Sequence, residues 1–281
     1  MIEDGFPEFF KKSDAHSLLW QARYLRSERA QLVCLLLAAL CANFGRGGLV
    51  LVVLLFVVAV GSNIFRLVSK ADQKWWNGRA GAESAKTVSW RYVVGGAPFS
   101  LDQPMVDQLL AQRLSELATK VADMVPVAVG TSAVTSDMRT LRAEPLSRRV
   151  EEYQRHRVKD QMEWYCSKSE FNEQRGQYWS WLAILAQVVG MGLGIVGLVQ
   201  HLDFDFVGLL SAAAAAAVAW SAVKQHEVLA RSYAVASNEL GIIDAQISDS
   251  TWDEEGWAAF VNEAEEAISR EHTSWRASRA V

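Results

Sequence analysis

Four long apolar stretches, in which charged residues are nearly absent, constrain this sequence more than any other feature. They cover residues 30–46, 47–66, 179–200 and 206–223. A helix needs about 20 residues to cross the ~30 Å hydrocarbon core of a bilayer. The first stretch is the shortest, and we extend it to Arg46 because a long basic side chain there can reach the interface. A buried helical hairpin of a large soluble protein is the alternative, but 10–14 apolar residues would suffice for it. The sequence therefore predicts an all-α membrane protein with four spans.

The spans are arranged as two pairs. Only a few polar residues separate the members of each pair, so each pair predicts a tight helical hairpin. Both halves of the chain repeat one order, in which a charged helix leads into two spans and a charged helix follows them. We therefore expect a first two-span unit with its cytoplasmic linker at residues 1–144 and a second two-span unit at 145–281.

Basic residues predict how the hairpins are oriented. Lysines and arginines crowd before the first span and after the second span of each pair, whereas the tips hold Arg46 or the two aspartates Asp203 and Asp205. Loops rich in Lys and Arg stay in the cytoplasm. We expect a multi-pass protein of the cell inner membrane, with both termini and long helical extensions in the cytoplasm. The acidic N-terminus does not resemble a secretory signal.

The segments outside the spans predict further helices. We expect helix to continue from residue 66 to 94, ending at the break Gly95-Gly96-Ala97-Pro98, and again from residue 224 to 247. Helices are also predicted over 102–124, from Pro145 into the third span, and over 252–270, where Thr251 and Glu254 match a capping box. Residues 126–136 predict a loop or a short extended piece.

Several functional classes find no support. The net charge of −4 gives no reason to expect a nucleic-acid partner. The five histidines and three cysteines lack metal-site or disulfide spacing, and no nucleophile elbow or phosphate loop occurs. The spans carry no ionisable residue at depth, which argues against an ion-coupled carrier. We expect a protein that is not an enzyme and that uses no cofactor and no metal.

Glycines in the third span are candidates for close helix packing. Gly190, Gly194 and Gly197 are spaced so that another helix backbone could approach them, with the alanine run 212–217 of the fourth span as a partner. Small residues of this kind could equally line a narrow pore. The match of residues 192–197 to the dinucleotide fingerprint carries little weight, because it lies within an apolar span without a preceding strand.

The segment after the first hairpin is the most distinctive. Its candidate residues for a cytoplasmic contact or gate are Arg79, Glu83, Lys86, Trp90 and Tyr92. The charged members are spaced three or four residues apart, so they share one helix face. One interpretation is a helix surface tied by ion pairs and anchored by aromatic rings. The other is an inter-subunit or ligand-sensing contact just below the membrane.

These residues carry a family resemblance. The segments that carry it are 79–87 with Trp90-Arg91-Tyr92 and Pro98-Phe99, then 155–168, which includes Asp160, Gln161, Trp164 and Tyr165, and finally 271–276. In this order the chain resembles a two-unit member of the bacterial SLATT proteins, membrane effector domains associated with nucleotide synthases and sensors. The resemblance adds Asp160, Gln161, Trp164 and Tyr165 to the candidate contact residues.

Membership would imply an oligomeric, pore-forming or membrane-perturbing effector of an antiphage or other conflict system, gated from the cytoplasm. Its expected partners are the lipid bilayer, further copies of the chain, and a nucleotide second messenger or a soluble sensor protein. No nucleotide-sensor domain is recognised in the sequence. The alternative is a membrane scaffold that conducts nothing and recruits a soluble partner.

Overall fold

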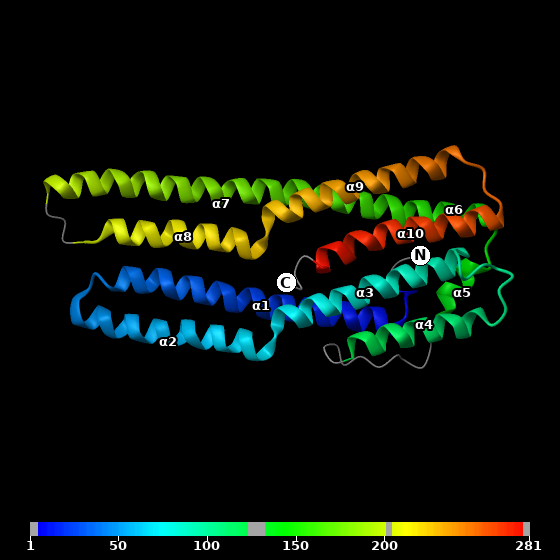
Figure 1. The fold of residues 1–281 in the computed structure, drawn as a ribbon, viewed down its shortest axis with the longest axis horizontal. Helices are drawn as coiled ribbons and strands as arrows, with labels where there is room; N and C mark the ends of the chain where they lie inside the picture. The colour runs from blue at the N-terminus through cyan, green and yellow to red at the C-terminus, as the bar shows by residue number, and fades with distance from the viewer. Residues whose placement is uncertain (1–4, 123–132, 201–203, 278–281) are drawn as a thin grey trace. The chain divides into compact units, whose positions relative to one another are not determined.

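The computed structural model describes residues 5–122, 133–200 and 204–277, with side chains up to residue 269, and these ranges are helical apart from turns and short connections (Figure 1). The helices are α1 (Glu8–Cys41), α2 (Gly45–Ser69), α3 (Ala71–Val94), α4 (Val106–Val121), α5 (Ser136–Arg142), α6 (Leu146–Tyr153), the π-helical segment η2 (Gln154–Lys159), α7 (Asp160–Val199), α8 (Phe206–Lys224), α9 (His226–Asp249) and α10 (Glu254–Ala277). The prediction of an all-α fold is confirmed for these ranges. The predicted loop at 126–136 lies largely outside them.

The two halves of the chain repeat one order of helices. A long helix (α1 or α7) is followed by an apolar helix (α2 or α8), then by a helix of 24 residues (α3 or α9) and a further helix (α4 or α10). The apolar helix ends each time at a residue in the left-handed conformation, Lys70 with φ 49° and Gln225 with φ 54°. The prediction that helix continues without a break past residues 66 and 224 is therefore wrong at one residue in each half.

Each half contributes to two compact units. The first, termed here the core unit, contains residues 1–20, 72–167 and 232–281, and the second, the hairpin unit, contains residues 21–71 and 168–231. The compact units therefore do not follow the two halves of the sequence. The unbroken helices α1 and α7 each contribute residues to both units.

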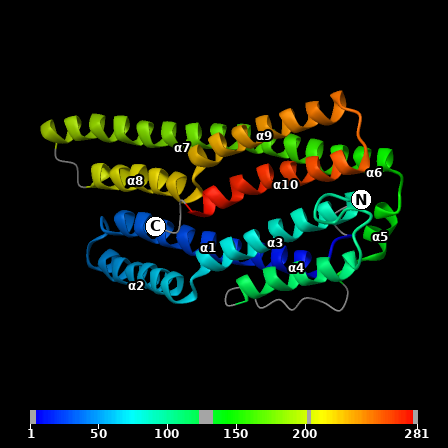
Figure 2. The same ribbon diagram turned by 45° about the vertical axis from the view of Figure 1, so that its right-hand side comes forward.

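The hairpin unit contains the apolar parts of α1, α2, α7 and α8, and Figures 1 and 2 show α1 beside α2 and α7 beside α8. Three described helical stretches are long and apolar enough to cross a membrane: α2 (Gly45–Ser69), the stretch from α6 through α7 (Leu146–Val199) and the stretch formed by α8 and α9 (Phe206–Asp249). Their apolar windows are only 11–17% buried inside the protein. Apolar helices with so little contact to protein need lipid around them, so the chain is a multi-pass membrane protein.

The first predicted span differs from the other three. Helix α1 ends at Cys41, and α2 begins at Gly45 with φ 58°, so the turn between the two helices lies a few residues before the predicted end of the span at residue 46. Charged residues, among them Glu28 and Arg29, directly precede the apolar part of α1. This helix is not among the three candidate membrane-spanning stretches. Glu28 is nearly buried and forms an ion pair with Arg66 of α2, which joins the two helices of this hairpin.

Aromatic rings form much of the centre of the core unit. Trp90 of α3 packs edge to face against Tyr153 of α6 at 5.9 Å between ring centroids, and Tyr153 packs in the same way against Trp257 of α10 at 5.6 Å. All three side chains are buried. Such pairs add to the large apolar area that aromatic residues bury, so these contacts join helices that lie far apart in the sequence.

Helix starts are set by local polar groups. The side chain of Asp253 accepts a hydrogen bond of 2.8 Å from the backbone N–H of Gly256, so Asp253 caps α10. The capping box predicted at Thr251 is therefore wrong by two residues, although the predicted helix is present. Pro145 precedes α6, as predicted, because proline suits the start of a helix, where its missing N–H costs no hydrogen bond.

Candidate functional site

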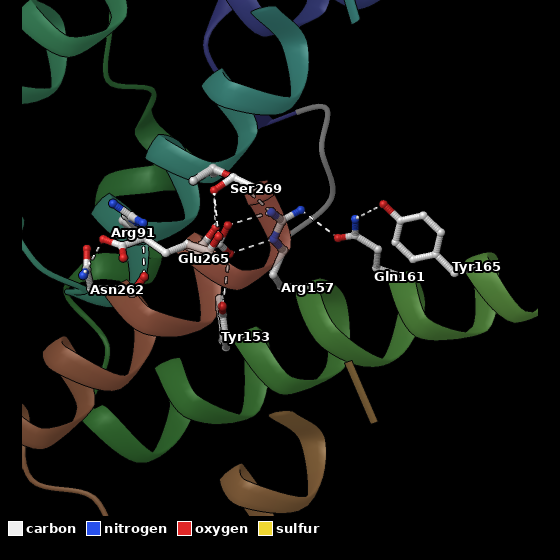
Figure 3. A network of polar contacts seen from close by, with 10 residues as sticks. Arg91, Tyr153, Arg157, Gln161, Tyr165, Asn262, Glu265 and Ser269 are labelled. Atoms are coloured by element: carbon white, nitrogen blue, oxygen red, sulfur yellow. Dashed lines mark hydrogen bonds and ion pairs between the residues drawn. The ribbon is translucent and has the colours of Figure 1, made fainter. Parts of the chain in front are cut away.

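A buried ion pair lies at the centre of the candidate site in the core unit (Figure 3). Two nitrogens of Arg157 in η2 donate to the carboxylate of Glu265 in α10, over 2.6 and 2.8 Å, and both side chains are fully buried. The hydroxyl of Tyr153 donates to the same carboxylate at 3.0 Å. Arg157 also donates to the hydroxyl of Thr87 in α3 at 3.2 Å. Two charges out of water persist only when they are paired and hydrogen-bonded, as here.

Tyr153 and Arg157 both keep their protons at neutral pH. Burial, reinforced by the charge of Glu265, raises the pKa of Tyr153 well above its usual value, so its phenol remains a donor. Burial lowers the pKa of Arg157, but the charge and hydrogen bonds of Glu265 outweigh this effect and leave that pKa above its usual value. Tyr153 and Arg157 therefore both act as hydrogen-bond donors that connect α6 and η2 to α10.

Arginines also hold the end of α3. Arg142 donates to the carbonyl oxygens of Tyr92 and of Phe99, the latter at 2.8 Å, and Arg149 donates to that of Val94 at 2.7 Å. The indole N–H of Trp257 reaches the Val94 oxygen as well, at 2.9 Å. The last carbonyls of a helix lack partners within the helix and form the negative end of its dipole, so cations suit this place.

The turn that follows α3 is fixed by α10. Gly95 has φ 79°, a conformation that favours glycine, and the N–H of Ala97 donates to the carbonyl of Ala258 at 2.9 Å. A β-carbon on Gly96 would lie 2.4 Å from a methyl group of Val261, so no larger side chain fits there. The break predicted at Gly95-Gly96-Ala97-Pro98 is therefore a packed joint between α3 and α10.

Three of the candidate residues of α3 are half-buried and two are fully buried. Arg79 and Glu83 form an ion pair of 3.5 Å, and Lys86 is half-buried. Trp90 and Tyr92 are buried in the core, so they offer no surface for a contact.

Tyr92 is held by a polar contact at the edge of this core. Its hydroxyl donates to Asp107 of α4 at 2.5 Å. Burial and that hydrogen bond raise the pKa of Tyr92 to about 12, and the same bond lowers the pKa of Asp107. The bond therefore joins a neutral phenol to an ionised carboxylate and fixes α4 against α3.

The predicted candidate residues after η2 lie in the first turns of α7, next to Arg157. Gln161 accepts from Arg157 at 2.7 Å and lies 3.4 Å from the hydroxyl of Tyr165. The rings of Trp164, Tyr165 and Tyr233 form a cluster with centroids 5.1–5.5 Å apart.

Arg79 connects this aromatic cluster with α3. Burial lowers the pKa of Arg79, but Glu83 and the nearby Tyr233 and Tyr165 raise it above its usual value. The structure therefore brings Arg79, Gln161, Trp164 and Tyr165 to one region. Asp160 is exposed and bonds with His156 at 3.0 Å instead.

Several central residues were missed at the sequence level. They are Thr87, Arg142, Arg149, Tyr153, Arg157 and Glu265, of which Thr87 and Arg157 lie in segments that carry the family resemblance. One usable signal exists for Glu265. It shares a helix face with the buried residues Trp257, Val261 and Ile268, and a carboxylate on such a face needs a buried partner.

Two of the three candidate glycines in the third span lie against α8. A β-carbon on Gly190 would meet Leu210 at 3.5 Å, and one on Gly194 would meet Val207 at 3.7 Å, whereas Gly197 is exposed. On the same two helices, the buried residues Ala183, Ala214 and Ala217 form a small cluster. Small residues thus line the contact between α7 and α8.

The described residues contain no group of three or more His, Cys, Asp or Glu side chains that could hold a metal ion. The polar groups of the site bond to one another and to helix ends, an arrangement suited to joining helices.

Comparisons with known proteins identify both halves of the chain. Residues 7–150 match the family model described as SMODS and SLOG-associating 2TM effector domain 3, and residues 153–275 match that of SMODS and SLOG-associating 2TM effector domain 1. A search of curated proteins and a search of solved structures each found no match. Because the first of these models alone covers more than half of the sequence, the chain belongs to the SMODS and SLOG-associating two-transmembrane (SLATT) effector family.

Proposed function

We propose that this protein is an oligomeric membrane effector of a bacterial antiphage or other conflict system, which opens a pore or otherwise perturbs the inner membrane when it is triggered from the cytoplasm. The single observation that carries the proposal is the match of both halves to effector domains with two spans each. The weakly buried apolar helices α2, α7 and α8 support an effector that acts within the bilayer.

The core unit is the part that we propose to restrain the hairpins. Its buried bonds join the two halves, because Arg157 contacts Thr87 and Trp257 contacts the end of α3. Helices α1 and α7 run without interruption from this unit into the apolar stretches. A movement of the core unit would therefore be carried along these helices. A trigger must bind the rearranged state more tightly than the resting state, since otherwise it shifts no population.

The proposed topology has four spans. The apolar part of α1 would cross the membrane with α2, because these two helices form a hairpin joined by the Glu28–Arg66 pair. The basic residues that flank both hairpins favour cytoplasmic termini and a cytoplasmic core unit.

The trigger would act on the surface of the core unit. The region around Arg79 and the partly exposed Trp164 combines a cation with aromatic rings, a combination that suits a nucleotide or a soluble sensor protein. We propose that no reaction is catalysed there, in keeping with the expectation that this protein is not an enzyme.

The test is a leakage assay with the full chain in liposomes that hold a fluorescent dye and a potassium gradient. Leakage that scales with the inserted protein and rises with a candidate nucleotide would support the effector. A matched control is Glu151→Gln, which removes a carboxylate from an exposed pair and should leave leakage unchanged. Tight vesicles in every condition, together with stable co-purification of a soluble protein, would favour the non-conducting scaffold.

A further inference from the structure

An apolar groove of about 650 Å³ runs along the hairpin unit, lined by α1, α7 and α8. This volume lies within the range of binding sites for small molecules. The walls are formed by Leu, Val, Ala and Trp side chains, and Arg29 is the one charged residue among the described residues that line it. Any occupant must therefore be largely apolar, with polarity only at the Arg29 end.

The groove has the depth of one membrane leaflet. Trp179 of α7 and Trp220 of α8 line the same end of the groove as Arg29. The guanidinium of Arg29 lies 5.1 Å from the centre of the Trp220 ring. The lining extends to Val189 on α7 and Leu210 on α8, ten residues further along each helix. At 1.5 Å per residue this is about 15 Å. That distance is half of the ~30 Å hydrocarbon core. The two tryptophans therefore lie at the level expected for the membrane–water interface, where tryptophan and tyrosine are enriched.

Two cations without a carboxylate partner lie at the interfacial end. Lys224, the last residue of α8, lies about one helical turn beyond Trp220, over whose ring Arg29 sits. Within the described ranges neither forms an ion pair, in contrast to Arg66, which Glu28 neutralises. Two unpaired cations at the mouth of an apolar groove favour an anionic group there.

We propose that the groove binds an anionic phospholipid, with its phosphate between Arg29 and Lys224 and one acyl chain along α7 and α8. The apolar length matches one leaflet, and the charge at the mouth is opposite to that of the headgroup. A zwitterionic lipid offers the same phosphate but brings a cationic headgroup beside the two cations, so a lipid with a net negative charge is favoured. The site is distinct from the core unit, and its occupancy does not depend on whether the protein conducts.

Lipid retention by the purified full chain tests the proposal. The protein is incubated with equal amounts of phosphatidylglycerol and phosphatidylcholine in detergent, and native mass spectrometry measures which lipid stays bound. Wild type should retain phosphatidylglycerol in preference, and Arg29→Gln should lower that retention about fivefold. Arg29→Lys should preserve it. The matched control is Arg231→Gln, since the Arg231 side chain is 84% exposed and lies outside the groove lining.

A second variant tests the groove itself. Ala213 lines it, and Ala213→Trp fills apolar space without changing any charge, so it should release the phospholipid. Helix content by circular dichroism and elution volume show that each variant is folded. Equal retention of the two lipids would overturn the proposal, as would an equal loss in Arg231→Gln or unchanged retention in Ala213→Trp. An altered oligomer mass in Ala213→Trp without any lipid effect would assign the groove to a second copy of the chain, and this would also refute the proposal.

Discussion

Replacing Glu265 by glutamine should destabilise the core unit strongly. The carboxylate accepts two hydrogen bonds from Arg157 and one from Tyr153, and water reaches neither member of the ion pair. Glutamine keeps the shape of the side chain but removes its charge. The guanidinium of Arg157 would then remain buried beside a neutral amide, with its charge uncompensated.

The expected cost is large. Breaking a buried ion pair by removing one partner costs about 3–5 kcal/mol, because the other charge stays buried. For domains of 150–250 residues, each kcal/mol shifts the melting temperature by about 2–4 °C. Glu265→Gln should therefore lower the melting temperature of the core unit by roughly 6–20 °C.

Thermal unfolding in detergent, followed by circular dichroism and by limited proteolysis, measures this effect. The control is Glu151→Gln, because Arg148 and Glu151 form a pair of 2.6 Å whose side chains are about half exposed. Exposed pairs contribute about 0–1 kcal/mol, so that variant should melt close to wild type. Replacing both partners, as in Arg157→Met with Glu265→Leu, should recover much of the loss, since no charge is then left buried.

A Glu265→Gln variant that melted within about 1 °C of wild type would refute this prediction, because that shift is far below the one expected when a buried ion pair is broken. It would also fail if the double replacement were no more stable than the single one. The same variant tests the proposed restraint on the hairpins. Vesicles with folded Glu265→Gln should leak without a trigger, and tight vesicles would show that the core unit does not hold the hairpins closed.

Two further predictions follow from the contacts. Gly190→Leu should weaken the packing of α7 on α8 and reduce crosslinking between them, because Leu210 lies against Gly190, whereas Gly197→Leu at an exposed position should not. Tyr92→Phe removes the hydrogen bond to Asp107 and should cost about 1 kcal/mol at neutral pH. Because that bond lowers the pKa of Asp107 in the folded state, its stabilising contribution is full above pH ~4 and is lost as the pH falls through the folded pKa. Melting curves should therefore show the gap between wild type and Tyr92→Phe closing toward pH 3, and a constant gap would contradict this account.

The sequence by itself determined the helical class, three candidate membrane-spanning helices and the family. Hydropathy over 20 residues is a local property, so α2, the apolar end of α7, and α8 could be recognised without knowing what packs against them. The family resemblance rested on short motifs at helical spacing, which are also local.

The breaks at Lys70 and Gln225 had no local signal. A left-handed residue is usually glycine or asparagine, and neither stands at these positions. Without a glycine or asparagine to mark the break, the sequence alone predicted continuous helix there.

The candidate site was also decided by tertiary structure. Trp90 and Tyr92 share a helix with Arg79, and nothing in the sequence distinguishes the three as contact residues. The helices packed on α3 nevertheless bury the two aromatic side chains. Arg157 finds its partner Glu265 at a separation of 108 residues. The physical reason is that spacing along one helix shows which residues share a face, whereas the burial and partner of that face depend on helices from the other half of the chain.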